Sequence, residues 1–249
     1  MSLNLCIDWG NTNIKVALAA NGKLQRPVIV SEESILEQVT GIIESHKPDK
    51  AILCSVSQHS VELEMMLRSK IKGAVILTGN TNVPINNAYL SADTLGADRL
   101  ALVCGAHASY PGKNNLVISI GTCITYNLLQ NNRTFRGGAI SPGLQMRFKA
   151  MNAFTSMLPE VKKYDVDDAL LLGYDTETCI QSGVVNGMIA EIDGMISMYA
   201  ERYTDFNAIL TGGDAPHFAG RLKNKIFADP DLLMKGCDLI LDHNVPLPQ

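Results

Sequence analysis

The stretch Asp8-Trp9-Gly10-Asn11-Thr12 is a short, mostly polar segment between the apolar run 3–7 and a second apolar run, 14–18. Two runs of strand length joined by a short polar segment predict a β-hairpin. The glycine lacks the Cβ that keeps backbone N–H groups away from a ligand, and the residues after it, with Lys15, supply short donors and one cation. The stretch therefore has the groups that hold a phosphate, although the same residue types are common in ordinary hairpin turns.

The composition fits a globular chain of one large α/β domain or two lobes: of 249 residues, 46% are hydrophobic and 18% charged. The formal charge of -4 and the lack of a Lys/Arg stripe among aromatics argue against nucleic-acid binding. Six cysteines without a CxxC pair and five histidines without metal-site spacing argue against structural zinc. Neither a signal peptide nor a membrane span is expected, and a cytoplasmic location fits the scattered cysteines.

Apolar periodicity predicts strands alternating with helices after the first hairpin. The expected strands cover residues 28–30, 50–56, 74–77, 115–122, 124–129, 134–138 and 208–210, and the expected helices cover 35–43, 61–71, 94–110, 144–157 and 176–203. Residues 83–93 are expected to form a loop. The tail around 239–241 is compatible with a strand or a helix.

The order of elements after residue 113 repeats that of residues 3–30, displaced by about 110 positions, which indicates an internal duplication. In the duplicate, Ser119 takes the place of Asp8, and Gly121-Thr122 takes the place of the first glycine turn. We therefore expect two related α/β lobes, residues 1–112 and 113–249.

A third strand end carries Thr211-Gly212-Gly213-Asp214-Ala215. Three glycine turns at strand ends predict a nucleotide held in a cleft between the lobes. The chain has no GxxxxGK[ST] sequence and no GxGxxG that opens a βαβ unit, so it holds the nucleotide by other means than a P-loop or a dinucleotide fold.

Asp98-Arg99 stands at the expected start of a helix, after the small residues Gly96 and Ala97. Phosphoryl transfer needs a base near the attacking oxygen, a cation on the transferred group and Mg²⁺ on the phosphates. Asp98 and Arg99 suit the first two roles, and Asp8 suits metal binding. The alternative is that Asp98 only caps the helix and Arg99 makes a surface ion pair.

In their order along the chain, these motifs resemble those of type III pantothenate kinases, which catalyse the first step of coenzyme A biosynthesis. The matching segments are Asp8-Trp9-Gly10-Asn11-Thr12, Gly96-Ala97-Asp98-Arg99, Gly121-Thr122 with Thr125, Gly137-Gly138-Ala139-Ile140-Ser141-Pro142-Gly143, Thr176 with Gln181-Ser182-Gly183, and Thr211-Gly212-Gly213-Asp214-Ala215.

The resemblance implies the actin-like (ribonuclease H-like) fold of acetate and sugar kinases, with two duplicated lobes and a nucleotide cleft. It implies ATP-dependent phosphorylation of pantothenate to 4'-phosphopantothenate, a phosphotransferase reaction with an alcohol acceptor and Mg-ATP as donor. It also implies a cytoplasmic homodimer with dimerisation helices in residues 113–249, and no nucleic-acid or membrane partner.

The resemblance further implies roles for single residues. Asp98 would take the proton of the pantothenate hydroxyl, and Arg99 would hold the substrate or the incoming phosphoryl group. The remaining implied contacts are Tyr89, Gly96, Ala97 and, from a dimer partner, Thr176 for pantothenate; Asp8, Gly10, Asn11, Thr12, Lys15, Gly121, Thr122 and Thr125 for phosphate and Mg²⁺; and Gly212 and Gly213 for adenosine.

Ser119 departs from the family pattern, which usually has an acidic residue at this position near a bound monovalent cation, K⁺ or NH₄⁺. A serine keeps an oxygen ligand for the cation and loses the charge. We therefore expect activity with an altered potassium dependence, because Asp8 and Asp98 are both present.

Other interpretations remain open at the level of sequence. The chain could be an actin-like nucleotide-binding regulator that has lost its chemistry, although Asp98 and Arg99 argue against that; a sugar kinase is disfavoured because the chain is short. Tyr89 could simply pack on its own lobe. The apolar stripe 180–196 is expected to serve the core or a dimer interface, and not a ligand.

Overall fold

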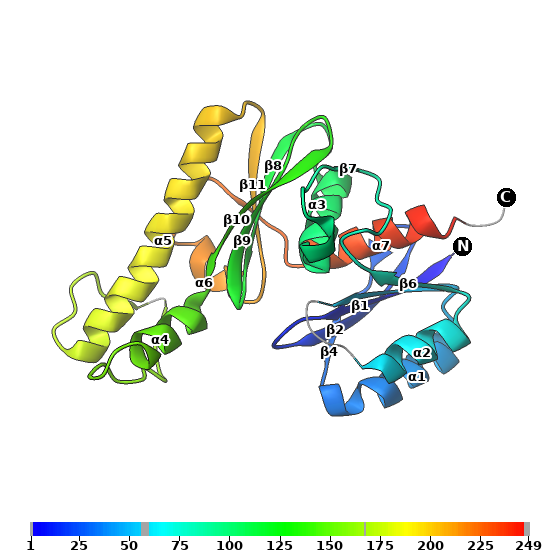
Figure 1. Cartoon of the computed structure of the whole chain (residues 1–249), viewed down its shortest axis with the longest axis horizontal. Coiled ribbons are helices and arrows are strands. Elements are labelled where there is room, and N and C mark those ends of the chain that lie inside the picture. The colour runs from blue at the N-terminus through cyan, green and yellow to red at the C-terminus, as the bar shows by residue number, and fades with distance from the viewer. Residues whose placement is uncertain (1, 56–59, 167, 247–249) are drawn as a thin grey trace. The chain divides into compact units, whose positions relative to one another are not determined.

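The computed structural model describes residues 2–55, 60–166 and 168–246. Contacts divide the chain into two compact units, which we treat separately (Figure 1). Unit 1 contains Met1–Gly112, Leu129–Arg136 and Asp231–Gln249, and unit 2 contains Lys113–Leu128 and Gly137–Pro230. The division into domains 1–112 and 113–249 stays a prediction, and the compact units differ from it in two segments.

Unit 1 is built on a sheet with the strand order β3-β2-β1-β5-β6, in which β4 also pairs with β2. β1 is antiparallel to β2 and parallel to β5, as the expected hairpin and a helical crossover require. The strands are β1 (Leu3–Trp9), β2 (Ile14–Ala20), β3 (Lys23–Leu24), β4 (Val28–Val30), β5 (Lys50–Ser55) and β6 (Gly73–Leu77). The expected last residue of β5, Val56, lies outside the described residues.

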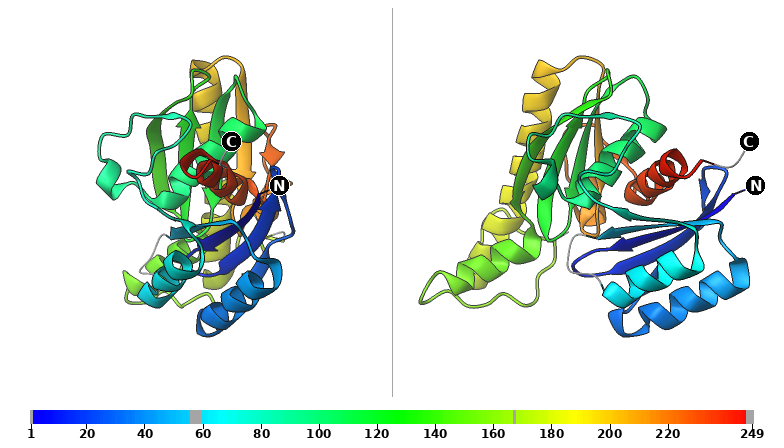
Figure 2. Two further views of the ribbon diagram at one scale, coloured as in Figure 1. Left: turned by 90° about the vertical axis from the view of Figure 1, so that its right-hand side faces the viewer. Right: turned by 45° about the vertical axis from the view of Figure 1, so that its right-hand side comes forward.

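Helices cover both faces of this sheet (Figure 1). One face carries α1 (Ile35–His46) and α2 (Val61–Lys70), which lie side by side in Figure 2. The other face carries α3 (Ala97–Ser109) and α7 (Leu232–Asn244).

Alternation along β1 assigns its side chains to these two faces. Leu5 and Ile7 belong to the buried cluster with α1 and α2, whereas Cys6 belongs to the cluster with α3 and α7. Asp8 is two residues after Cys6, so its side chain lies on the same face of the strand. The strand pattern therefore directs the Asp8 side chain to the α3/α7 face.

The tail that the sequence left undecided is the helix α7, packed against α3. Two glycines allow this close approach, because a Cβ at Gly105 would lie 2.1 Å from the Leu232 carbonyl oxygen and one at Gly236 would lie 1.8 Å from that of Ala101. The long-range contact, and not the local sequence, selects the helix.

Unit 2 repeats the topology of unit 1, which confirms the predicted duplication. Its strand order β12-β11-β8-β9-β10 matches β6-β5-β1-β2-β3 strand for strand. The strands are β8 (Asn114–Ile120), β9 (Cys123–Leu129), β10 (Thr134–Pro142), β11 (Phe206–Thr211) and β12 (Phe227–Ala228). The helices are α4 (Leu144–Ala153), α5 (Thr176–Arg202) and α6 (Ala215–Ala219).

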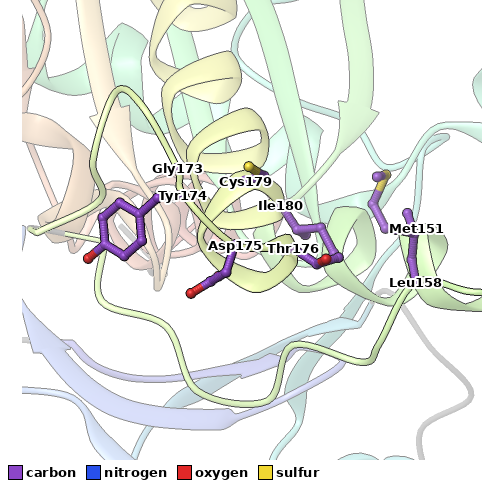
Figure 3. Close-up of a pocket in the computed structure, with 8 residues that line it drawn as sticks. All are labelled: Met151, Leu158, Gly173, Tyr174, Asp175, Thr176, Cys179 and Ile180. Atoms are coloured by element: carbon purple, nitrogen blue, oxygen red, sulfur yellow. The ribbon is translucent and has the colours of Figure 1, made fainter.

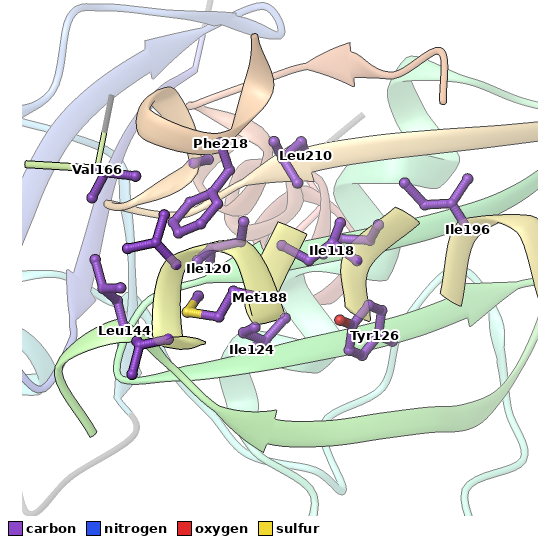
Figure 4. Close-up of a cluster of buried hydrophobic side chains, with 14 of the residues drawn as sticks. Ile118, Ile120, Ile124, Tyr126, Leu144, Val166, Met188, Ile196, Leu210 and Phe218 are labelled. Carbon is purple, nitrogen blue, oxygen red and sulfur yellow. The ribbon is translucent and has the colours of Figure 1, made fainter. Parts of the chain in front are cut away.

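The core of unit 2 lies between the sheet and α5 (Figure 4). Met188 of α5 is fully buried there with Ile118 and Ile120 of β8 and Tyr126 of β9. The buried positions of α5 recur at helical spacing: Ile180, Val184, Val185, Met188, Ile192 and Ile196. The apolar stripe 180–196 is thus confirmed as core.

Several expected boundaries were wrong, among them the start of α3, which begins at Ala97, three residues after the expected start. The loop 83–93 contains a two-residue strand, β7 (Asn86–Asn87), and the short 3-10 helix η2 (Ala92–Thr94), and β10 runs on to Pro142. α4 ends at Ala153, four residues before the expected end. The Thr155 hydroxyl donates to the Met151 carbonyl at 2.6 Å, and such local side-chain bonds compete with continued helix.

Candidate active site

Asp8 is the residue before the end of β1, on the α3/α7 face, and it lies opposite Lys15 of β2 in the antiparallel register. Burial raises the pKa of Asp8 to about 7; the Lys15 ammonium opposes this shift and the Asp98 carboxylate adds to it. The two carboxyl groups are therefore close enough to interact within unit 1. Repulsion between like charges and burial make a proton or a metal ion favourable at this site.

The turn after Asp8 closes through a 3.1 Å hydrogen bond from the Gly10 N–H to the Asn13 carbonyl. A Cβ at Gly10 would lie 3.1 Å from the same oxygen, so the turn is tightest at the glycine. Asn11 and Thr12 are exposed at its tip. The turn presents the two side chains that the sequence predicts as phosphate donors.

The N-terminus of α3 carries Asp98 in its first turn, with Gly96 as the N-cap residue. A Cβ at Gly96 would lie 2.5 Å from Asp98 Oδ1, so the glycine leaves room for this carboxylate. Burial raises the pKa of Asp98, and the backbone N–H of Arg99 and its guanidinium oppose that shift only in part. Asp98 is thus not the N-cap, and Ala97 beside it is buried in the core.

Arg99 is buried, with 6% of its surface exposed, so the alternative of a surface ion pair was wrong. Its Nη1 donates to the Tyr89 hydroxyl at 3.4 Å, and its Cζ lies 5.4 Å from the centre of the Tyr89 ring. This distance is within the range of a cation–π contact. The structure therefore brings together Tyr89, Asp98 and Arg99, which the sequence places in one candidate site.

Phe135 is a residue of this site that the sequence reasoning missed. Its ring stacks on Tyr89 with 5.9 Å between centroids and 11° between planes. Tyr89 thus packs within its compact unit, on a residue of the second predicted lobe, 113–249, and contacts Arg99 as well. The one signal in the sequence that could have indicated Phe135 is its place two residues before the glycine pair Gly137-Gly138.

Unit 2 brings its two predicted glycine turns together. Ser119 pairs with Thr211 across β8 and β11, and the Asp214 N–H donates to the Ile120 carbonyl at 3.1 Å. Gly212 has φ +99°, and a Cβ on it would lie 2.3 Å from the Ile120 carbonyl oxygen. Backbone packing therefore joins the turn after Ser119 to the Gly212-Gly213 turn.

Gly143 supports the Gly121-Thr122 turn from the opposite side. Its N–H donates to the Thr122 carbonyl at 3.0 Å, and a Cβ at Gly143 would lie 2.0 Å from the Gly121 carbonyl oxygen. Thr125, on the next strand, accepts a 3.0 Å hydrogen bond from the Asn127 amide. The turn is a compact backbone structure without a charged side chain of its own.

A pocket of about 510 Å³ adjoins the Gly212-Gly213 turn. Polar and charged side chains dominate its lining: Gln145, Lys162, Lys163, Tyr164, Asp165, Asp214 and His217, with Leu144 and Val166. Burial raises the pKa of Asp214, and the charge of His217 opposes this. The pocket offers both signs of charge beside the predicted adenosine turn.

A second pocket, of about 600 Å³, contains Thr176 (Figure 3). It is lined by Met151, Leu158, Gly173, Tyr174, Asp175, Thr176, Cys179 and Ile180. Asp175 caps α5 through a 2.8 Å hydrogen bond from the Thr178 N–H, which secures the first turn where Thr176 lies exposed. Thr176 belongs to unit 2 and the predicted substrate residues Tyr89, Gly96 and Ala97 to unit 1.

Within the described part of the chain, no group of three or more His, Cys, Asp or Glu side chains could hold a metal ion. Mg²⁺ in phosphoryl-transfer enzymes commonly has one or two carboxylate ligands and takes the rest from substrate phosphates and water. Asp8 fits this mode of binding. Among the described residues, no helix combines the length and apolar character needed to cross a membrane.

The fold is actin-like, with two duplicated α/β lobes. A glucokinase from an Antarctic psychrotroph has a similar structure, with a TM-score of 0.55 at 14% identity, covering 98% of this chain and all of that one. A Campylobacter jejuni protein assigned to a Baf family of transcriptional activators matches with a TM-score of 0.60 at 20% identity, over 98% and 100% of the two chains. At such identities the likeness concerns the fold alone.

Sequence comparison gives the family. The model of type III pantothenate kinase matches residues 4–198. The type III pantothenate kinase of Christiangramia forsetii is 40% identical over 243 residues, covering 97% of this chain and 99% of that protein. The chain belongs to the type III pantothenate kinase family, whose reaction is the phosphorylation of pantothenate in coenzyme A biosynthesis. No observation supports the alternative of a regulator without chemistry.

Proposed function

We propose that this chain transfers the γ-phosphoryl group of Mg-ATP to the 4'-hydroxyl of pantothenate, with Asp98 as the general base. The observation that carries this proposal is the start of α3: Asp98 and the buried Arg99 lie in one helical turn, close enough to Asp8 for the two carboxyl groups to interact. A base, a cation and a metal-binding carboxylate are the protein groups that phosphoryl transfer needs.

In this mechanism Asp98 accepts the hydroxyl proton as the pantothenate oxygen attacks the γ-phosphorus and the bond to the ADP oxygen breaks. Burial raises the pKa of Asp98, which makes it a better proton acceptor than a solvated carboxylate. Gly96, Ala97 and Tyr89 are the proposed pantothenate contacts beside it. The Arg99 guanidinium holds negative charge on the transferred group.

We assign the phosphates of ATP to the turn after Asp8, through Gly10, Asn11, Thr12 and Lys15. Bound Mg²⁺ would spread the charge of the phosphates, with Asp8 as its protein ligand. The exposed tip of the turn and the pairing of Asp8 with Lys15 support this assignment.

We assign the remaining nucleotide contacts to unit 2: Gly121, Thr122 and Thr125 to phosphate, and Gly212 and Gly213 to adenosine. The left-handed Gly212 and its close packing on Ile120 support a turn built for backbone contacts. The polar pocket beside Asp214 has the volume for a nucleoside.

A monovalent cation, K⁺ or NH₄⁺, is proposed to bind near Ser119 more weakly than beside an acidic residue. Ser119 lies next to Thr211 in the register, so two hydroxyl oxygens are available and no carboxylate accompanies them on these strands.

A homodimer is proposed from a group of exposed apolar side chains in unit 2. Five of them are at least 80% exposed: Phe154, Met157, Leu171, Leu172 and Tyr174. Single exposed apolar residues are ordinary, but a group in two neighbouring segments is typical of an interface. The group flanks the pocket that holds Thr176, so a dimer partner could receive Thr176 in its pantothenate site.

The test is ADP formation by the purified chain with Mg-ATP, with and without pantothenate. Dependence of ADP release on pantothenate supports the proposal, and Asp98→Asn should lower kcat by about 10²–10⁴-fold, the usual worth of a general base. Asp93→Asn, a nearby exposed carboxylate, is the matched control. Activity unchanged in Asp98→Asn would reject Asp98 as the base.

A further inference from the structure

Phe135 joins two predicted substrate residues that are distant from it in the sequence. It is fully buried near the start of β10, and this part of the strand belongs to unit 1. Its ring stacks on Tyr89, and the Arg99 Cζ lies 6.0 Å from its centroid and 5.4 Å from that of Tyr89. The guanidinium thus contacts both rings of one aromatic stack.

The backbone around Phe135 also holds the segment that carries Tyr89. Phe135 pairs with Asn87 in the β7–β10 register, and its carbonyl accepts a 2.8 Å hydrogen bond from the Ala88 N–H. The Asn87 side chain in turn accepts a 3.3 Å bond from the Tyr89 N–H. The segment before Tyr89 is therefore attached to the strand of Phe135 by main-chain as well as ring contacts.

Such a stack restricts the orientation of Arg99. The Arg99 Cζ lies within cation–π range of both rings, and the guanidinium also has five N–H donors for hydrogen bonds. The Tyr89 hydroxyl accepts one of these bonds, at 3.4 Å. Because the Phe135 ring contacts both Tyr89 and Arg99, it sets the direction of the other N–H donors of the Arg99 guanidinium.

We propose that Phe135 is a positioning residue for the acceptor substrate: its ring holds Tyr89 and Arg99 in the arrangement that binds pantothenate, and Phe135 itself makes no contact with the substrate. This inference rests on the proposed function, in which Tyr89 and Arg99 contact pantothenate. A residue that only filled the core would change stability and leave the affinity for pantothenate unchanged.

The experiment compares Phe135→Leu with wild type in steady-state kinetics, varying pantothenate and ATP separately. We expect the KM for pantothenate to rise about tenfold, as loss of a buried cation–π and stacking contact implies, and the KM for ATP to change less than about twofold. Phe135→Tyr keeps the ring and should recover most of the loss. Phe135→Met is a second ring-less variant if Phe135→Leu does not fold.

Leu241→Ala is the control, because Leu241 is a fully buried member of the same hydrophobic cluster outside the stack. It should lower the melting temperature and leave the KM for pantothenate unchanged. An equal rise of this KM in Leu241→Ala, or an unchanged KM in Phe135→Leu with only a lower melting temperature, would overturn the proposal.

A double variant tests whether Phe135 acts through Tyr89. If it does, Phe135→Leu should raise the KM for pantothenate by a smaller factor in the Tyr89→Leu background than in the wild type, and the remaining rise is the part exerted through Arg99. Multiplication of the two single effects would overturn it. If the wild-type chain does not phosphorylate pantothenate at all, the proposed function fails and this inference fails with it; an active wild type with unaffected variants rejects this inference alone.

Discussion

The first hairpins of the two units have the same topology and different chemistry. In unit 1, Asp8 lies opposite Lys15 and interacts with Asp98, and four residues separate its strands. In unit 2, Ser119 lies beside Thr211, and two residues separate the strands. The first turn has charged side chains beside it and an exposed tip, while the second has no charged side chain and consists of closely packed backbone.

This contrast shows that a duplicated fold can carry different chemical groups at two equivalent turns. The repeat determines where each strand ends and which face its side chains take, so Asp8 and Ser119, each one residue before the end of its strand, occupy equivalent positions. The repeat does not determine which side chains from other elements lie next to Asp8 and Ser119. The start of α3 places a second carboxyl near Asp8, whereas β11 places a hydroxyl next to Ser119.

The largest expected difference between the two turns concerns catalysis. Asp8→Asn should lower kcat by about 10²–10³-fold, because it removes the charged ligand proposed for Mg²⁺. Ser119→Ala should lower kcat by less than about tenfold, because it removes a neutral oxygen. Steady-state assays at saturating Mg-ATP would decide, and equal losses in the two variants would contradict the division of roles.

Backbone packing should matter more in the second turn than charge does. Gly212→Ala should reduce the free energy of unfolding by about 2–4 kcal/mol, because the new Cβ would meet main-chain atoms of Ile120 and the residue needs a positive φ. Gly213→Ala is the matched control, since among the described residues nothing beyond its own chain neighbours lies within 4 Å of its Cβ position. Urea unfolding of both variants measures the difference, and similar losses would show that the packing is not specific.

The charge on Asp8 should make the first turn sensitive to pH. The pKa of Asp8 is about 7 in the folded chain against 3.8 ordinarily, so the folded state binds the proton more tightly. The contribution to stability is full below about pH 4 and is lost as the pH rises through 7. Without Mg²⁺ and nucleotide, Asp8→Asn should raise the unfolding free energy by about 1–3 kcal/mol at pH 8 and hardly at pH 4.

Thermal unfolding at both pH values measures this effect, with Ser119→Ala as the control that should show no such pH dependence. A gain in Asp8→Asn that is equal at pH 4 and pH 8 would contradict the assigned pKa.

The smallest expected effect concerns the monovalent cation. Ser119→Asp makes the second turn resemble the first in charge, and it should lower the KCl concentration for half-maximal activity severalfold, because a carboxylate binds a cation better than a hydroxyl does. A KCl titration of both proteins is the measurement. Strong activation of the wild type at low KCl would contradict weak binding at Ser119.

Much of the fold follows from local sequence. The two apolar runs 3–7 and 14–18 predict the β1–β2 hairpin, and the helical spacing of the apolar residues 180–196 predicts the buried face of α5. These predictions succeed because a strand and a helix have fixed periods and one buried side each. The end of α4 was predicted wrongly because local side-chain hydrogen bonds of Thr155 competed with the helix.

The candidate site was predicted in part. Tyr89, Asp98 and Arg99 are recognisable as motif residues, and the structure brings them together. Phe135 was missed because a single apolar residue in a strand does not indicate which distant residues it will contact. Its stacking on Tyr89 depends on the β7–β10 pairing, which joins segments 48 residues apart, as in the bond between Asn86 and Thr134.

The sequence by itself determined the duplication, the hairpin at Asp8-Trp9-Gly10-Asn11-Thr12 and the family, since these depend on residue order and on periods within one element. Only the tertiary structure decided that the tail is a helix, that residues Leu129–Arg136 belong with unit 1, and that Asp8 shares its face with Asp98 at interacting distance. The physical reason is that burial and charge interactions depend on which distant segments pack together, as Gly105 and Gly236 show for α3 and α7.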